Sequence, residues 1–265
     1  HFGNQALQKW DDKKAVARDP KTLEKYRTLL AEQIQYFKVT QYFFFKQWSE
    51  LKHYANQKGI KIIGDMPIYV AADSVEVWTK PELFQLDKER NPLFVAGVPA
   101  DQFSATGQLW GNPLYAWEEH KKQGYSWWIH RIEESFKIYD VLRIDHFKGF
   151  SDYWQVDGKA EVAKDGSWQP GPGYDLFKAV KEQLGDLPII AEDLGFLTDS
   201  VKKLLADSGF PGMKVFELGF DSRDTNGNGY QPHNFIRDCV AYTGTHDNDT
   251  IQGWFASADP VDTEW

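Results

Sequence analysis

The sequence predicts an α/β protein built on a TIM-type (β/α)8 barrel, present as a partial barrel of about five strands. Short apolar runs with the β-branching of buried strands alternate with helix-like stretches, and 265 residues suffice for one such domain. Acids at the carboxyl ends of parallel strands converge on one site in this fold. Four of the runs end in an acid within a polar turn: Ile60–Ile63 leads to Asp65, Ile138–Ile144 to Asp145, Pro188–Ala191 to Glu192 and Cys239–Thr243 to Asp247.

Each of these acids could instead cap a helix or a turn, because Asp is favoured at both positions. Four acids in the same place after four strand-like runs favour a shared site. A fifth strand is expected at Met213–Phe220, between Glu192 and Asp247. Five strands do not close a barrel that needs eight, so we expect residues 1–265 to be part of a catalytic barrel domain and to be inactive alone.

The first 59 residues look helical. Apolar residues recur there at a spacing of three to four, typical of one helix face, and Gly59 suits the end of the helix. We expect this face to pack against the sheet. Its residues are Ile34, Phe37, Phe44, Trp48, Leu51 and Ala55.

A long insertion is expected after the first strand, since about 80 residues separate Asp65 from Asp145, too many for one βα step. We place it at residues 74–125, over the barrel mouth, with a centre rich in Pro, Gly and aromatic residues. A packed Ω-loop with its own small core is the alternative. Helices are expected at Tyr125–Tyr139 and Tyr174–Leu184, with a turn-rich stretch at 157–173 between them.

Composition narrows the function classes. The net charge of −9 and the lack of a long basic run argue against nucleic acid as a partner. No run of 18 apolar residues or signal-peptide pattern occurs, so no membrane partner is expected. The single cysteine, Cys239, fits a reducing, cytoplasmic location. Aromatic residues make up 15% of the chain, which suits a protein that binds the apolar faces of sugars.

Three acids form the expected catalytic set. Asp145 lies two residues after Arg143, and a nearby cation lowers the pKa of an acid, so we expect Asp145 to be ionised. Carboxylates close together cannot all ionise, and Glu192 has the longer reach, so we expect Glu192 to hold a proton. With Asp247 nearby, a carboxylate beside a carboxylic acid is the arrangement of a retaining glycosidase.

Two patterns in the sequence suggest metal-binding sites as alternatives. Acids at barrel strand ends also bind Mg2+ in enolase-type sites, where Lys214 would be the base, but no clear metal-ligand spacing occurs. Asp224–Gly229 opens like a calcium-binding EF-hand loop, yet Phe235 stands where the bidentate Glu is required. We therefore expect no metal and no cofactor.

The motifs resemble those of glycoside hydrolase family 77, the 4-α-glucanotransferases called amylomaltases or disproportionating enzymes, in the α-amylase clan. The resemblance spans nearly the whole chain, although family members extend further at both ends. Lys148 stands where many relatives have Arg, and Ala105 stands where some relatives have Glu. The matching segments are Gly64–Val70, Gly97–Tyr115, Arg143–Phe147, Ala191–Gly195 and Tyr242–Thr250.

The resemblance implies a transferase that moves segments of α-1,4-glucans between maltooligosaccharides, with Asp145 as nucleophile, Glu192 as general acid/base and Asp247 as transition-state stabiliser. An α-glucan hydrolase of the same clan and a non-catalytic glucan-binding protein are the alternatives. The resemblance also implies that further residues line the glucan site: Asp65, Asp101, Gln108, Trp110, Arg143, His146 and His246.

Overall fold

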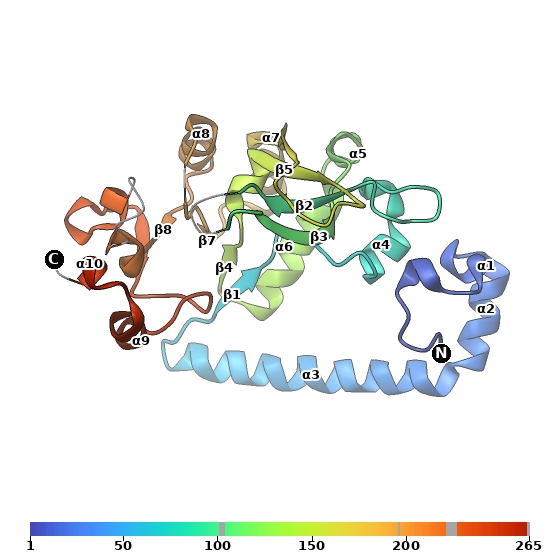
Figure 1. The fold of residues 1–265 in the computed structure, drawn as a ribbon. Coiled ribbons are helices and arrows are strands. Elements are labelled where there is room, and N and C mark those ends of the chain that lie inside the picture. The colour runs from blue at the N-terminus through green and yellow to red at the C-terminus, as the bar shows by residue number, and fades with distance from the viewer. Residues whose placement is uncertain (101–103, 196, 221–226, 264–265) are drawn as a thin grey trace.

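The computed structural model describes residues 1–100, 104–195, 197–220 and 227–263 (Figure 1). Within these residues the strands form three sheets, two parallel and one antiparallel. One parallel sheet contains β1 (Ile63–Met66), β4 (Val141–Ile144) and β7 (Ile189–Ala191), and the other contains β8 (Gly212–Val215) and β9 (Cys239–Tyr242). The antiparallel sheet has the order β3 (Gln108–Pro113), β2 (Phe94–Val98), β5 (Asp152–Asp157) and β6 (Ser167–Pro170).

Helices connect these strands and cover the parallel sheets. None of the helices in the described ranges combines the length and the apolar character that a membrane span requires. The α-helices are α1 (Lys13–Val16), α2 (Pro20–Leu29), α3 (Ala31–Gln57), α4 (Val75–Thr79), α5 (Trp117–Lys122), α6 (Ser126–Ile138), α7 (Tyr174–Leu184), α8 (Asp199–Ser208), α9 (Ile251–Ser257) and α10 (Pro260–Thr263).

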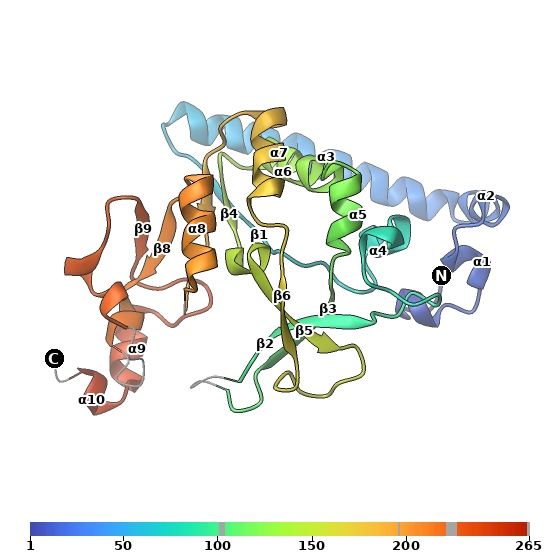
Figure 2. The same ribbon diagram turned by 90° about the horizontal axis from the view of Figure 1, so that it is seen from above.

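The two parallel sheets follow one another in chain order. A hydrogen bond of 2.9 Å from the Ala191 N–H to the Pro211 carbonyl joins β7 to the residue before β8. The parallel strands therefore run β1, β4, β7, β8 and β9, with helices α6, α7 and α8 in the crossovers (Figure 2). No closed barrel forms in the described part of the chain, since β1 pairs only with β4 and β9 only with β8.

Several predicted boundaries need correction. Helix α7 occupies the predicted residues, Tyr174–Leu184. The first strand, predicted at Ile60–Ile63, begins at Ile63, so Asp65 lies inside β1 rather than in the turn after it. Of the strand predicted at Met213–Phe220, only the start belongs to β8, and a 3-10 helix, Phe216–Phe220, follows.

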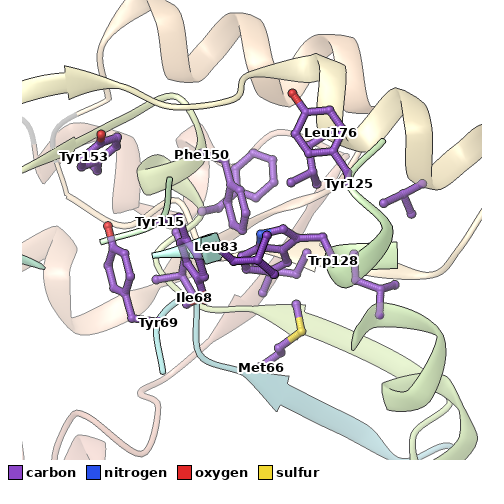
Figure 3. Close-up of a cluster of buried hydrophobic side chains, with 14 of the residues drawn as sticks. Met66, Ile68, Tyr69, Leu83, Tyr115, Tyr125, Trp128, Phe150, Tyr153 and Leu176 are labelled. Carbon is purple, nitrogen blue, oxygen red and sulfur yellow. The ribbon is translucent and has the colours of Figure 1, made fainter. Parts of the chain in front are cut away.

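The main core lies between α6, α7 and strand β4. Trp128 of α6 is completely buried and contacts Phe150, with ring centroids 5.1 Å apart. Tyr115, from the end of the insertion, packs at 5.2 Å from Trp128 and donates its hydroxyl hydrogen to the Ile68 carbonyl (Figure 3). Tyr115 thus joins this part of the chain to α6 and to the segment after β1.

The predicted insertion does not form a sheet by itself. Its strands β2 and β3 pair with each other, and β2 also pairs with β5, which follows Asp145 in the sequence. The turn-rich stretch predicted at 157–173 contains β6, the outer strand of the same sheet. This antiparallel sheet therefore combines residues from before and after β4. The boundaries 74–125 and a place over the barrel mouth stay predictions.

The prediction that the α3 stripe packs against the sheet is wrong for the described residues. No residue of α3 is buried, and Phe37, Phe44 and Leu51 are each more than half exposed. In Figures 1 and 2, α3 runs along the outside of the molecule. It touches the body near its C-terminal end, where Trp48 donates a hydrogen bond to Ile138 and Lys52 to Tyr139. The apolar face has too few neighbours here to be covered.

Gly64 of β1 permits close packing of the residue after α6, and its substitution gives a stability prediction. A Cβ at this position would lie 2.0 Å from the Tyr139 ring, so Gly64→Ala must displace the ring or the strand. We expect a loss of about 1–3 kcal/mol in the free energy of unfolding, measured by urea denaturation. Gly229→Ala is the control, because its Cβ would meet nothing within 4 Å. Equal stability of the two variants would contradict this packing.

Candidate active site

Strand β4 brings Arg143 and Asp145 to the centre of the site. In the parallel register Asp65 of β1 lies opposite Arg143, so the two side chains meet on one face. The Arg143 Nη1 atom lies 2.7 Å from both carboxylate oxygens of Asp65 and 3.0 Å from Oδ1 of Asp145. Arg143 therefore holds two acids at once, and only 9% of its side chain is exposed.

Met213 of β8 also contacts the Arg143 guanidinium. Its sulfur accepts a hydrogen bond of 3.3 Å from Arg143 Nε. Burial opposes the charge on Arg143, but its contacts with Asp65 and Asp145 outweigh this effect and raise its pKa. The guanidinium is thus a fixed positive charge held from strands on both sides.

The expected pKa of Asp145 needs correction. We predicted that Arg143 would lower it, and the predicted contact is present. Burial nevertheless raises the pKa of Asp145, and the negative charges of Asp65 and Asp247 act in the same direction. Arg143 offsets part of this rise, because it also neutralises Asp65. The sequence does not reveal this sharing of the cation.

Glu192 follows β7 and has the raised pKa expected of a proton donor. Burial raises the pKa of Glu192 to about 7, and the charge of Asp145 adds to the rise. The backbone N–H groups of Leu194 and His146 oppose it, donating 2.8 Å hydrogen bonds to Oε1 and Oε2 respectively. At neutral pH both protonation states of Glu192 are populated, so it can give up and take back a proton.

Asp247 and His246 come from the turn after β9. Hydrogen bonds from the backbone N–H and hydroxyl of Thr245 to the Asn248 side chain fix this turn. The His246 Nε2 atom lies 3.8 Å from Asp65 and 3.5 Å from Asp247. About two thirds of each of the His246 and Asp247 side chains is exposed, so this side of the site is open to solvent.

Three of the predicted substrate-binding residues lie at or next to β3: Gln108, Trp110 and His146. Trp110 stands edge-on to the His146 ring, with centroids 4.8 Å apart, and donates a 3.2 Å hydrogen bond to Gln108. Burial lowers the pKa of His146 to about 4, which keeps the ring neutral. Its Nε2 atom is buried without a hydrogen-bond partner in the described structure. Asp101, also predicted here, lies outside the described residues.

Sequence reasoning missed the role of Asp193. Successive residues point to opposite sides of an extended chain, so Asp193 faces away from Glu192. It is buried, and its carboxylate accepts a 2.6 Å hydrogen bond from the Met213 N–H. A Cβ on Gly212 would lie 2.5 Å from the Asp193 carboxylate, so glycine is needed there. The sequence signal that could have indicated this role is the second acid, Asp193, directly after Glu192 at the end of an apolar run.

Asp145, Glu192 and Asp247 thus follow β4, β7 and β9, beside Asp65 and Arg143, which lie within β1 and β4. The glycoside hydrolase family 77 model, described as 4-alpha-glucanotransferase, matches residues 1–264. The chain belongs to this family. A 4-alpha-glucanotransferase of Streptococcus pneumoniae serotype 4 is 53% identical over 96% of this chain and 50% of its own length. A relative from Thermus thermophilus with the same description is 47% identical over 92% of this chain and 49% of its own.

One solved structure agrees with this assignment, and a more distant one shares the fold. An amylomaltase from Streptococcus agalactiae, in complex with acarbose, superposes with a TM-score of 0.95 and 60% identity over 99% of this chain. The match covers 53% of that structure's chain. An amylomaltase from Corynebacterium glutamicum shares the fold, with a TM-score of 0.68 at 18% identity. The chain therefore spans about half the length of the curated family members it matches.

Proposed function

We propose that this chain carries the catalytic acids of a 4-α-glucanotransferase that acts on α-1,4-glucans by a retaining double displacement. The observation that carries the proposal is the pairing of two unlike acids. Glu192 has a pKa of about 7 through burial, while Asp145 is bound to the Arg143 guanidinium. One acid is suited to proton transfer and the other to nucleophilic attack.

In the first step, Glu192 donates its proton to the glycosidic oxygen while a carboxylate oxygen of Asp145 attacks the anomeric carbon. The bond from that carbon to the leaving oxygen breaks, and a glucosyl ester of Asp145 forms. In the second step, ionised Glu192 takes the proton from a sugar 4-hydroxyl, whose oxygen attacks the same carbon and releases Asp145. Two inversions at one carbon preserve its configuration.

Asp247 is proposed to stabilise the positive charge that develops on the sugar ring in both steps. Its exposed carboxylate is close enough to the nucleophile to raise the pKa of Asp145. Asp65 and Arg143 would hold the nucleophile in place through the contacts described above. Further glucan contacts are proposed for the residues around this centre: Asp101, Gln108, Trp110, His146 and His246.

The fold is part of the same proposal. β1 and β9 each pair on one side only in the described residues, so further parallel strands could be added to both edges. We propose that the five parallel strands belong to an eight-stranded barrel, with residues 74–125 over its mouth. Maltooligosaccharides are the proposed partners, without a cofactor, nucleic acid or membrane, and the proposed location is cytoplasmic.

The products from maltotriose test the proposal. The aromatic insertion should limit water at the ester and admit an acceptor sugar. We expect the full-length protein to convert maltotriose into glucose and a ladder of longer maltooligosaccharides, with little net increase in reducing ends. Chromatography and a reducing-end assay measure the two quantities.

The same experiment separates the alternatives. An increase in reducing ends that matches the bonds broken, without longer products, would identify an α-glucan hydrolase instead. Binding of maltotriose without any product would identify a non-catalytic glucan-binding protein.

A further inference from the structure

Tyr230 contacts the turn that follows Glu192, although 35 residues separate Tyr230 from Gly195 in the sequence. It ends a short 3-10 helix, Gly227–Tyr230, and only 6% of it is exposed. Its hydroxyl oxygen accepts a 2.9 Å hydrogen bond from the Gly195 N–H. Tyr230 therefore contacts the backbone three residues after Glu192.

Gly195 is where the chain turns after Glu192. Its φ of +85° is a left-handed conformation that residues with a side chain rarely adopt. The preceding residue, Leu194, donates its N–H to Glu192 Oε1 at 2.8 Å. The Leu194 and Gly195 N–H groups lie in the two peptide planes on either side of Leu194, so the two hydrogen bonds together hold both planes. The Tyr230 hydroxyl thus fixes the peptide next to the one whose N–H contacts Glu192.

We propose that Tyr230 is a positioning residue for Glu192, which acts by holding the Leu194–Gly195 turn so that the Leu194 N–H points at Oε1. This inference rests on the proposed function, in which Glu192 is the general acid and base. Tyr230 would not touch the substrate in this role. It would set the direction of the Glu192 carboxyl group and its proton affinity.

The groups around Glu192 decide in which direction its pKa moves when Tyr230 is replaced. Asp145 on β4 raises the pKa of Glu192, whereas Arg143 on β4 and the N–H groups of Leu194 and His146 lower it. From β8, Lys214 lies over the Tyr230 ring, 5.0 Å from its centroid. Because an N–H donor stabilises the ionised carboxylate, a misaligned Leu194 N–H raises the pKa of Glu192 further.

A cavity beside the Leu194–Gly195 turn can supply water that replaces the Tyr230 hydroxyl as a hydrogen-bond acceptor. The cavity has a volume of about 600 Å3, and Gly195, Lys214 and Tyr230 line part of it. In Tyr230→Phe, water from the cavity can accept the Gly195 N–H in place of the phenol oxygen. A mobile water cannot hold the turn as a buried phenol does. The variant should therefore fold normally and differ in kinetics.

The test is Tyr230→Phe in the full-length protein, with two donors. With maltotriose, whose leaving oxygen must be protonated, we expect kcat/KM to fall about tenfold and the basic limb of its pH profile to move up by about half a pH unit. With maltosyl fluoride, whose leaving group needs little protonation, the rate of ester formation should change less than about twofold. Tyr153→Phe is the matched control: Tyr153 is 7% exposed and its hydroxyl accepts a hydrogen bond from Gln85.

Gly195→Ala disturbs the same turn from the backbone side, since its Cβ meets nothing within 4 Å but its φ is unfavourable. It should shift the maltotriose profile in the same direction as Tyr230→Phe, with melting temperatures measured for both variants. An unchanged basic limb in both variants would overturn the role of Tyr230, as would equal losses with the two donors. A wild-type protein that fails to elongate maltotriose would refute the proposed function instead.

Discussion

Replacement of Asp145 by Asn should abolish turnover, with a loss of at least about ten-thousandfold in kcat. An amide keeps the shape of the side chain and its place beside Arg143, but it cannot form the glucosyl ester. Transfer from maltotriose, measured by chromatography, is the assay. Asp157→Asn is the control, because Asp157 is an exposed acid of β5 that accepts a hydrogen bond from the Lys159 N–H. Activity of Asp145→Asn near the control would refute the nucleophile assignment.

Glu192→Gln distinguishes the role of Glu192 from that of Asp145. Transfer from maltotriose should be lost, while a glycosyl fluoride donor should still label Asp145, as shown by peptide mass spectrometry. In the unsubstituted protein, activity should fall as the pH rises through about 7, because the proton that Glu192 donates is then lost. A label on Glu192 or Asp247 would show that the roles are assigned wrongly.

Residues 1–265 by themselves should have no measurable transferase activity, which is the second large effect. Strands β1 and β9 each leave one edge unpaired in the described residues, and parallel strands depend on cover from both faces. The exposed aromatic rings of α3 add apolar surface that favours association. The acids would lose the framing that holds catalytic groups to within about 0.5 Å.

Size-exclusion chromatography and the maltotriose assay on the purified 265 residues measure this effect, with the full-length protein as the control. An aggregated or loosely packed, inactive chain is expected. A monomer that turns over maltotriose as fast as the full-length protein would contradict the prediction.

The strand ends could be read from the sequence because each signal is local. A short apolar run followed by an acid in a polar turn marks the end of a buried strand, as at Asp145 and Glu192. β1 was misplaced because Gly and Asp are poor strand formers, and Gly64 and Asp65 belong to it through their pairing with β4. The apolar face of α3 could be predicted only in part. The periodicity of its residues indicates an apolar face but does not identify the residues that cover it.

Within the site, the residue types and the raised pKa of Glu192 were predictable from the sequence, but the direction of the pKa shift of Asp145 was not. Arg143 does contact Asp145, yet burial and the competing contact with Asp65 decide the direction of the Asp145 pKa shift. Such competition requires the register of β1 against β4. Tyr230 and Gly195 meet only after the chain has folded, and no local pattern connects them.

The sharing of Arg143 between two carboxylates has a consequence for the proposed covalent intermediate. An esterified Asp145 would carry no charge, and a buried guanidinium paired with Asp145 alone would then be left without a counterion, a costly state in a low-dielectric interior. The two 2.7 Å contacts with Asp65 would keep that guanidinium paired in the proposed intermediate. Asp65 would thereby act as a second counterion that leaves the proposed nucleophile free to change charge.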